Sequence, residues 1–113
     1  MDEPRLKTGI RVAAHIRRAE AGGAFATIVR RGDGDAGAIA VKLYCGPRNA
    51  KLYIQSRDID GNAVWRDPFA DEDVGDEGIE ARIDQWLARE INIDPDLWII
   101  EIEDRQGRAF LED

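Results

Sequence analysis

Apolar residues recur at the spacing of one helix face in two segments of the chain. The first segment begins after Thr8, whose side chain suits a helix N-cap. It ends at the pair Gly22-Gly23, since glycine accepts the left-handed conformation of a helix exit. The second segment, Gly78–Ile91, has the clearest pattern. We therefore predict two amphipathic helices. Their apolar stripes are Val12, Ala13, Ile16 and Ala19 in the first, and Ile79, Ile83, Trp86, Leu87 and Ile91 in the second.

Apolar and β-branched residues outside these helices form short runs separated by turn residues, which is the pattern of a sheet. The run Phe25–Arg30 is apolar on both faces and therefore predicts a central strand. Short connections indicate that the four strands between the helices form an antiparallel meander. The predicted strands are Phe25–Arg30, Ala38–Tyr44, Lys51–Ser56, Asn62–Arg66 and, after the second helix, Leu97–Glu103, with Ala109–Leu111 as a further short edge strand.

The order of these elements predicts an α+β fold. We expect a two-layer architecture, in which two helices cover one face of a mostly antiparallel sheet of about five strands. The sequence has 113 residues, a length that suits one domain. The predicted domain is therefore residues 1–113, and residues 1–7 form a loose lead-in.

A two-layer architecture leaves the second face of the sheet open. In one register that face carries Tyr44, Tyr53 and Ile99, and in the other it carries Leu52 and Ile54. Exposed apolar area of this kind is typical of an interface. We therefore expect a homodimer through the open face, with Tyr44, Tyr53 and Ile99 as its interface residues.

Charge is distributed unevenly along the chain. Residues 1–57 contain 11 Lys and Arg against 5 Asp and Glu, whereas residues 58–113 contain 5 against 18. The asymmetry indicates either a surface for a protein partner or two halves that neutralise each other within one fold. The formal net charge of −7 repels a phosphate backbone, so a nucleic-acid partner is disfavoured.

Several features point to a protein of the cytoplasm. No apolar run approaches the roughly 18 residues of a membrane-spanning helix, so we expect no membrane association. The charged residues 1–7 lack the apolar core of a secretion signal. The single cysteine, Cys45, cannot form an internal disulfide, which agrees with a reducing compartment.

Residue types that carry catalysis are scarce. His15 is the only histidine and Cys45 the only cysteine, so a structural zinc site is excluded, and neither has an activating neighbour in sequence. Gly32, Gly34 and Gly37 follow the spacing G-x-G-x-x-G, but a strand rather than a helix comes next, which argues against a dinucleotide site. We therefore predict no cofactor, and the sequence favours a protein that is not an enzyme without deciding it.

Four arginines form the most basic local set. If the first helix packs near the first strand, Arg17 and Arg18 approach Arg30 and Arg31, and their guanidinium groups can hold a phosphate or an acidic peptide. The alternative is that these arginines pair with the acidic half of the chain.

Carboxylates are plentiful but occur mostly in turns, where Asp is favoured for local hydrogen bonds. We therefore predict no metal site. If a cation does bind, the densest candidate is formed by Asp94 and Asp96 with Glu101 and Asp104.

Two stretches of the chain resemble the signatures of an uncharacterised bacterial family, known as domain of unknown function 1491. The first is Gly22–Asp33, continued by Ala36–Ile39. The second is Asp94–Arg105, which ends in Gly107–Arg108 and Phe110–Leu111. The resemblance covers nearly the whole chain. It implies a small stand-alone bacterial protein with no assigned activity, and it carries over no catalytic residue.

Three functions remain open from the residues alone. The first is a non-enzymatic interaction module that binds a protein partner or itself, and it requires nothing that the sequence lacks. The second is a small-ligand or anion binder that uses the arginines. The third is a metal-assisted hydrolase that uses the carboxylates of Asp94, Asp96, Glu101 and Asp104.

Overall fold

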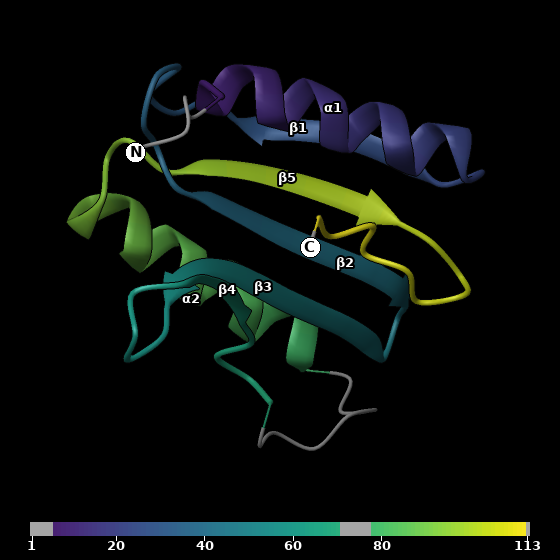
Figure 1. Ribbon diagram of the computed structural model, residues 1–113. Coiled ribbons are helices and arrows are strands. Elements are labelled where there is room, and N and C mark those ends of the chain that lie inside the picture. Colours follow the sequence, from purple (N-terminus) through teal and green to yellow (C-terminus); the bar gives the residue numbers. More distant parts are fainter. Residues whose placement is uncertain (1–5, 71–77, 113) are drawn as a thin grey trace.

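The computed structural model describes residues 6–70 and 78–112. In chain order its elements are α1 (Thr8–Ala21), β1 (Phe25–Arg30), β2 (Ile39–Gly46), β3 (Asn49–Arg57), β4 (Ala63–Arg66), α2 (Ile79–Ile93) and β5 (Trp98–Glu103). The strands form one sheet in the order β1-β5-β2-β3-β4 (Figure 1). Neighbouring strands are antiparallel except for the parallel pair β2 and β5. The predicted α+β class and the mostly antiparallel sheet of five strands are confirmed.

The two helices pack against opposite faces of the sheet, so the prediction that both cover one face is wrong. Side chains alternate between the faces along each strand, and β2 and β5 are apolar in both directions. Such strands need cover on both sides. Ile16 of α1 packs against one cluster and Trp86 of α2 against the other. The α1 face carries Ile39, Val41, Leu43, Trp98, Ile100 and Ile102, and the α2 face carries Ala40, Leu52, Ile54 and Ile99.

The last strand in sequence, β5, lies between β1 and β2, so the predicted four-strand meander is reduced to β2-β3-β4. Its run of apolar residues is buried on both faces, as expected of a central strand. The insertion of β5 displaces β1 to the edge of the sheet, and the prediction that β1 is central is therefore wrong. Phe25 and Val29 of β1 are 76% and 57% exposed.

The glycine-rich loop after β1 meets the start of α1. The backbone N–H of Gly9 donates to the carbonyl of Gly34 at 3.0 Å. The hydroxyl of Thr8 donates to the carbonyl of Gly37 at 2.8 Å, so Thr8 does not act as the side-chain cap that the sequence suggested. Carbonyl groups of the loop therefore satisfy the helix N-terminus, which removes it as an anion site.

Residues 104–112, called here the C-terminal segment, lie beside α1 across the α1 face (Figure 1). They do not form the additional edge strand predicted for Ala109–Leu111. Hydrogen bonds join the segment to α1 and to the residue that follows it. His15 contacts the carbonyl of Ala109 at 2.8 Å, and Arg18 donates to the carbonyl of Phe110 at 3.1 Å. The carbonyl of Gly22 accepts a hydrogen bond from Arg108 at 3.0 Å.

Within the described residues, no helix is both long enough and apolar enough to cross a membrane.

Candidate interaction surface and ligand pocket

The four arginines singled out from the sequence do not converge. Arg18 donates to a carbonyl of the C-terminal segment, and Arg30 donates at 2.7 Å to the carbonyl that precedes β5. The guanidinium of Arg31 lies 5.3 Å from the centroid of the Trp98 ring. Arg30 and Arg31 adjoin the loop at the start of α1, whereas Arg17 and Arg18 lie about 15 Å further along the helix axis. The arrangement offers no common site for a phosphate.

The candidate carboxylates are also separated. Asp94 accepts the backbone N–H of Asp96 at 3.2 Å in the turn before β5. Glu101 points to the α2 face, where it pairs with Lys42, and Asp104 lies beyond the far end of β5, roughly 20 Å from the turn. Among residues 6–70 and 78–112, no group of three or more His, Cys, Asp or Glu side chains is placed to hold a metal ion.

Asp104 instead binds Arg108 and so stabilises the start of the C-terminal segment. Its carboxylate accepts the backbone N–H of Arg108 at 2.8 Å and both Nε and Nη2 of the same guanidinium at 2.9 Å. The hydrogen bonds from Arg108 lower the pKa of Asp104 to about 2, against the opposing effect of burial. This carboxylate therefore stays ionised, and its role is to stabilise the fold.

The three predicted interface residues lie on different faces. Ile99 pairs with Ala40 on the α2 face and is only 3% exposed, because α2 covers it. Tyr44 shares that face and is half-buried. Tyr53 pairs with Val41 on the α1 face and packs against the cluster beneath α1. The structure therefore does not bring the three side chains into one surface.

One lysine is buried under α2 and surrounded by acidic side chains. Lys42 is 6% exposed, and its Nζ lies 2.8 Å from Asp84, 2.9 Å from Glu80 and 3.3 Å from Glu101. Burial opposes protonation, but the three carboxylates outweigh it and raise the pKa of Lys42. The amine of Lys42 therefore stays protonated. Its ion pairs join α2 to the sheet, and it does not act as a nucleophile.

His15 is buried and Cys45 is half-buried. His15 is 2% exposed, and burial lowers the pKa of its imidazole. Its ring meets the Trp65 ring edge-on, with centroids 6.3 Å apart. Burial also raises the pKa of the Cys45 thiol, which disfavours the reactive thiolate.

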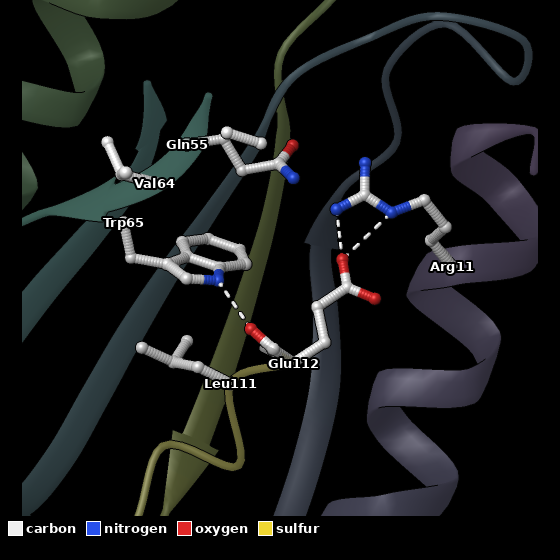
Figure 2. A pocket seen from close by; sticks show the side chains of 7 residues that line it. Arg11, Gln55, Val64, Trp65, Leu111 and Glu112 are labelled. Carbon is white, nitrogen blue, oxygen red and sulfur yellow. Dashed lines mark hydrogen bonds and ion pairs between the residues drawn. The ribbon is translucent and has the colours of Figure 1, made fainter. Parts of the chain in front are cut away.

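A pocket of about 380 Å³ opens on the α1 face between α1, β4 and the end of the C-terminal segment (Figure 2). Two groups of opposite charge meet at its wall: Nε of Arg11 lies 2.9 Å from a carboxylate oxygen of Glu112, and Nη2 binds the same oxygen. The apolar part of the wall consists of Ala63, Val64, Trp65 and Leu111.

The polar side chains of this pocket are held in place by the backbone. The Nε1–H group of Trp65 donates to the main-chain carbonyl of Glu112 at 3.2 Å. The side-chain oxygen of Gln55 accepts the backbone N–H of Ile39 at 3.0 Å. Because that oxygen must accept, the amide nitrogen of Gln55 faces the pocket as a donor, as Figure 2 shows.

The second exposed feature is the outer side of β1. Phe25, Thr27 and Val29 are exposed on this edge strand, next to Glu101 and Glu103 of β5. The α2 helix packs on β3 rather than here, so this part of the α2 face has no cover within the described chain. We call this strand, residues 25–30, with its outer edge and the exposed side chains of Phe25, Thr27 and Val29, the β1 surface.

The comparisons with known proteins identify the family. The model of a protein family described as "Protein of unknown function (DUF1491)" matches residues 6–112. The chain belongs to the DUF1491 family. None of the curated proteins matches it.

Solved structures share its fold, and two of them are of DUF1491 family proteins. The crystal structure of a DUF1491 family protein from Caulobacter crescentus is 44% identical, with a TM-score of 0.81 over 96% of this chain and 97% of that one. The NMR structure of a DUF1491 family protein from the same organism is 43% identical, with a TM-score of 0.84 over 98% and 96%. Protein Atu0922 from A. tumefaciens is 32% identical, with a TM-score of 0.74 over 96% and 93%. The DUF1491 description names no activity, so function must be argued from the surfaces.

The residues that form these two surfaces were not singled out from the DUF1491 sequence. Arg11 and Glu112 are 101 positions apart, so no local pattern joins them. Phe25 and Val29 did carry a signal, since their strand is apolar on both faces, but that signal was interpreted as burial within one chain.

Proposed function

We propose that this DUF1491 protein is a non-enzymatic interaction module that self-associates, with two copies pairing through antiparallel β1 strands. The observation that carries the proposal is that the amino-acid composition of β1 does not match its place at the edge of the sheet. The strand β1 has the two-sided apolar composition of a central strand, yet among the described residues it has a neighbouring strand on one side only. A second β1 strand supplies the missing neighbour.

The side chains of β1 favour an antiparallel arrangement. When Thr27 lies opposite Thr27 of the second copy, Phe25 of each chain comes beside Val29 of the other, forming aromatic and β-branched cross-strand pairs. Such pairs stabilise a sheet by roughly 0.2–1 kcal/mol each. The same register covers two large apolar side chains that are otherwise exposed.

Charges at the two ends of β1 support the same direction. Glu103 pairs with Phe25 at the start of the strand, whereas Arg30 and Arg31 stand at its end. In an antiparallel copy, the Arg30 and Arg31 end of one strand lies beside the Phe25 end of the other, where Glu103 stands on the next strand, β5. A parallel copy would place like charges together, which costs stability.

A binding role agrees with the state of the other charged groups. The side chains of Lys42, Asp104 and Arg108 pair with one another or with neighbours inside the fold rather than converging on a cleft. We place the module in the cytoplasm, a proposal that rests on its single cysteine.

Sedimentation velocity tests the proposal over a range of protein concentrations. We expect the chain of 12.6 kDa to sediment with twice that mass, and Val29→Lys to weaken association by at least about tenfold, because a lysine on an edge strand opposes pairing. Ile59→Lys is the matched control, since Ile59 is also an exposed apolar residue, 99% exposed, but lies in the turn between β3 and β4. A wild-type monomer at all concentrations would overturn the proposal, as would equal dimerisation of both variants.

A further inference from the structure

We propose that the pocket between α1, β4 and the C-terminal segment binds a small zwitterion, namely a free α-amino acid with an apolar side chain. The site lies on the α1 face and is independent of the β1 surface. Its volume of about 380 Å³ is at the small end of the range for ligand pockets, roughly 300–1,000 Å³. A ligand of amino-acid size therefore fits, whereas a nucleotide or a peptide would extend beyond it.

The paired charges in the wall select a zwitterion. Both Nε and Nη2 of Arg11 bind a single oxygen of Glu112. A guanidinium group has five N–H donors and a carboxylate has two oxygens, so this contact leaves donors on Arg11 and an acceptor oxygen on Glu112. The α-carboxylate of the ligand binds to Arg11 and its α-ammonium group binds to Glu112. A ligand with one charge only meets the opposing group as well, and is disfavoured.

Two further side chains of the pocket, Gln55 and Trp65, are already oriented to contact the ligand. The amide nitrogen of Gln55 donates to the ligand carboxylate, since its oxygen is already bound to the backbone of Ile39. The indole of Trp65 is fixed by its hydrogen bond to Glu112 and by the edge of the His15 ring. Because these groups are already ordered, binding loses little side-chain entropy.

The apolar wall accounts for the side chain of the ligand. Trp65 and Leu111 form one side of the pocket, as seen in Figure 2. An aliphatic or aromatic ligand side chain packs on this wall, while a charged one would lose hydration there without gaining a partner. The preferred amino acids are therefore leucine-like or phenylalanine-like.

Two-dimensional NMR of the labelled protein tests the site with L-phenylalanine as the probe. We expect saturable shifts of the Trp65 indole N–H and the Gln55 side-chain amide at roughly millimolar concentration or below. The analogues 3-phenylpropionate and phenethylamine, which lack the ammonium and the carboxylate respectively, should bind about tenfold to a hundredfold more weakly, because each loses a charge-assisted hydrogen bond.

Variants separate this site from nonspecific binding. Arg11→Gln removes the cation, and Ala63→Leu fills the pocket while leaving its polar groups intact, so both should abolish the shifts. Arg66→Gln is the control, since this exposed arginine pairs with Ile54 on the α2 face, on the other side of the sheet from the pocket. No saturable shift with L-phenylalanine or L-leucine, equal affinity for the single-charge analogues, or unchanged binding by Ala63→Leu would each overturn the inference.

Discussion

Gly32 and Gly37 show how one backbone contact can set a sequence motif. A Cβ atom on either residue would collide with the main-chain oxygen of Asp96, so the loop after β1 and the turn before β5 approach as closely as glycine permits. Gly34, the middle glycine, faces open space. The resemblance to a dinucleotide motif therefore arises from two obligatory glycines and one permissive position.

Alanine substitutions in this loop should differ accordingly. Gly37→Ala should lower the free energy of unfolding by about 1–3 kcal/mol, since the added methyl group meets rigid backbone. Gly34→Ala should change it by no more than about 0.5 kcal/mol. Urea denaturation of the three proteins measures the difference, and equal effects of the two substitutions would contradict the explanation.

At the scale of secondary structure, periodicity located the elements but not their neighbours. The apolar stripe at Ile79, Ile83 and Leu87 marked α2, and alternation marked β2, because these patterns are local. Such local patterns could not predict the order of the strands, since β5 lies between β1 and β2 although a long connection separates it from them in sequence. The pocket was equally out of reach, because Arg11 and Glu112 meet only through the path of the C-terminal segment.

The misplacement of the helices has the same origin. Val41 and Lys42 point to opposite faces, and a lysine in a strand usually marks a solvated side. Carboxylates from α2 and β5 neutralise it under a helix instead. A single sequence gives little indication that a buried lysine has partners so distant along the chain.

The link between α1 and the C-terminal segment should depend on pH through His15. Burial lowers its pKa in the folded state, so between that value and the unfolded value of about 6.5 the unfolded chain binds more protons. The free energy of unfolding should therefore fall as the pH drops below about 6.5 and should be independent of this group above that pH. Asp104, whose pKa is lowered to about 2, acts only in a more acidic range.

Urea denaturation at about pH 7.5 and about pH 5.5 checks this dependence. His15 is the only histidine of the sequence, so His15→Gln should remove the difference in that interval while keeping a side-chain donor for the carbonyl of Ala109. An NMR titration that places the folded pKa of His15 at or above 6.5 would rule out the mechanism.

On the scale of the whole molecule, the two faces of the sheet are covered to different extents. On the α1 face, α1 and the C-terminal segment together extend from β1 to β4. On the α2 face, α2 covers β3 and its neighbours, and in the part of the chain that the structure describes the outer region near β1 carries the exposed side chains of Phe25, Thr27 and Val29. Pairing of two copies through β1 continues the sheet across a two-fold axis to ten strands, and each chain keeps its pocket on the side away from α2.

Amide hydrogen exchange at two protein concentrations tests the pairing most directly. Within residues 6–70 and 78–112, the backbone N–H groups on the outer edge of β1 have no strand partner, whereas β5 has a paired strand on both sides at any concentration. The proposed dimer predicts that the outward-pointing amides among residues 25–29 become at least about tenfold better protected as the protein is concentrated, while those of β4, the opposite edge, do not change. Equal and concentration-independent exchange at both edges would contradict the dimer.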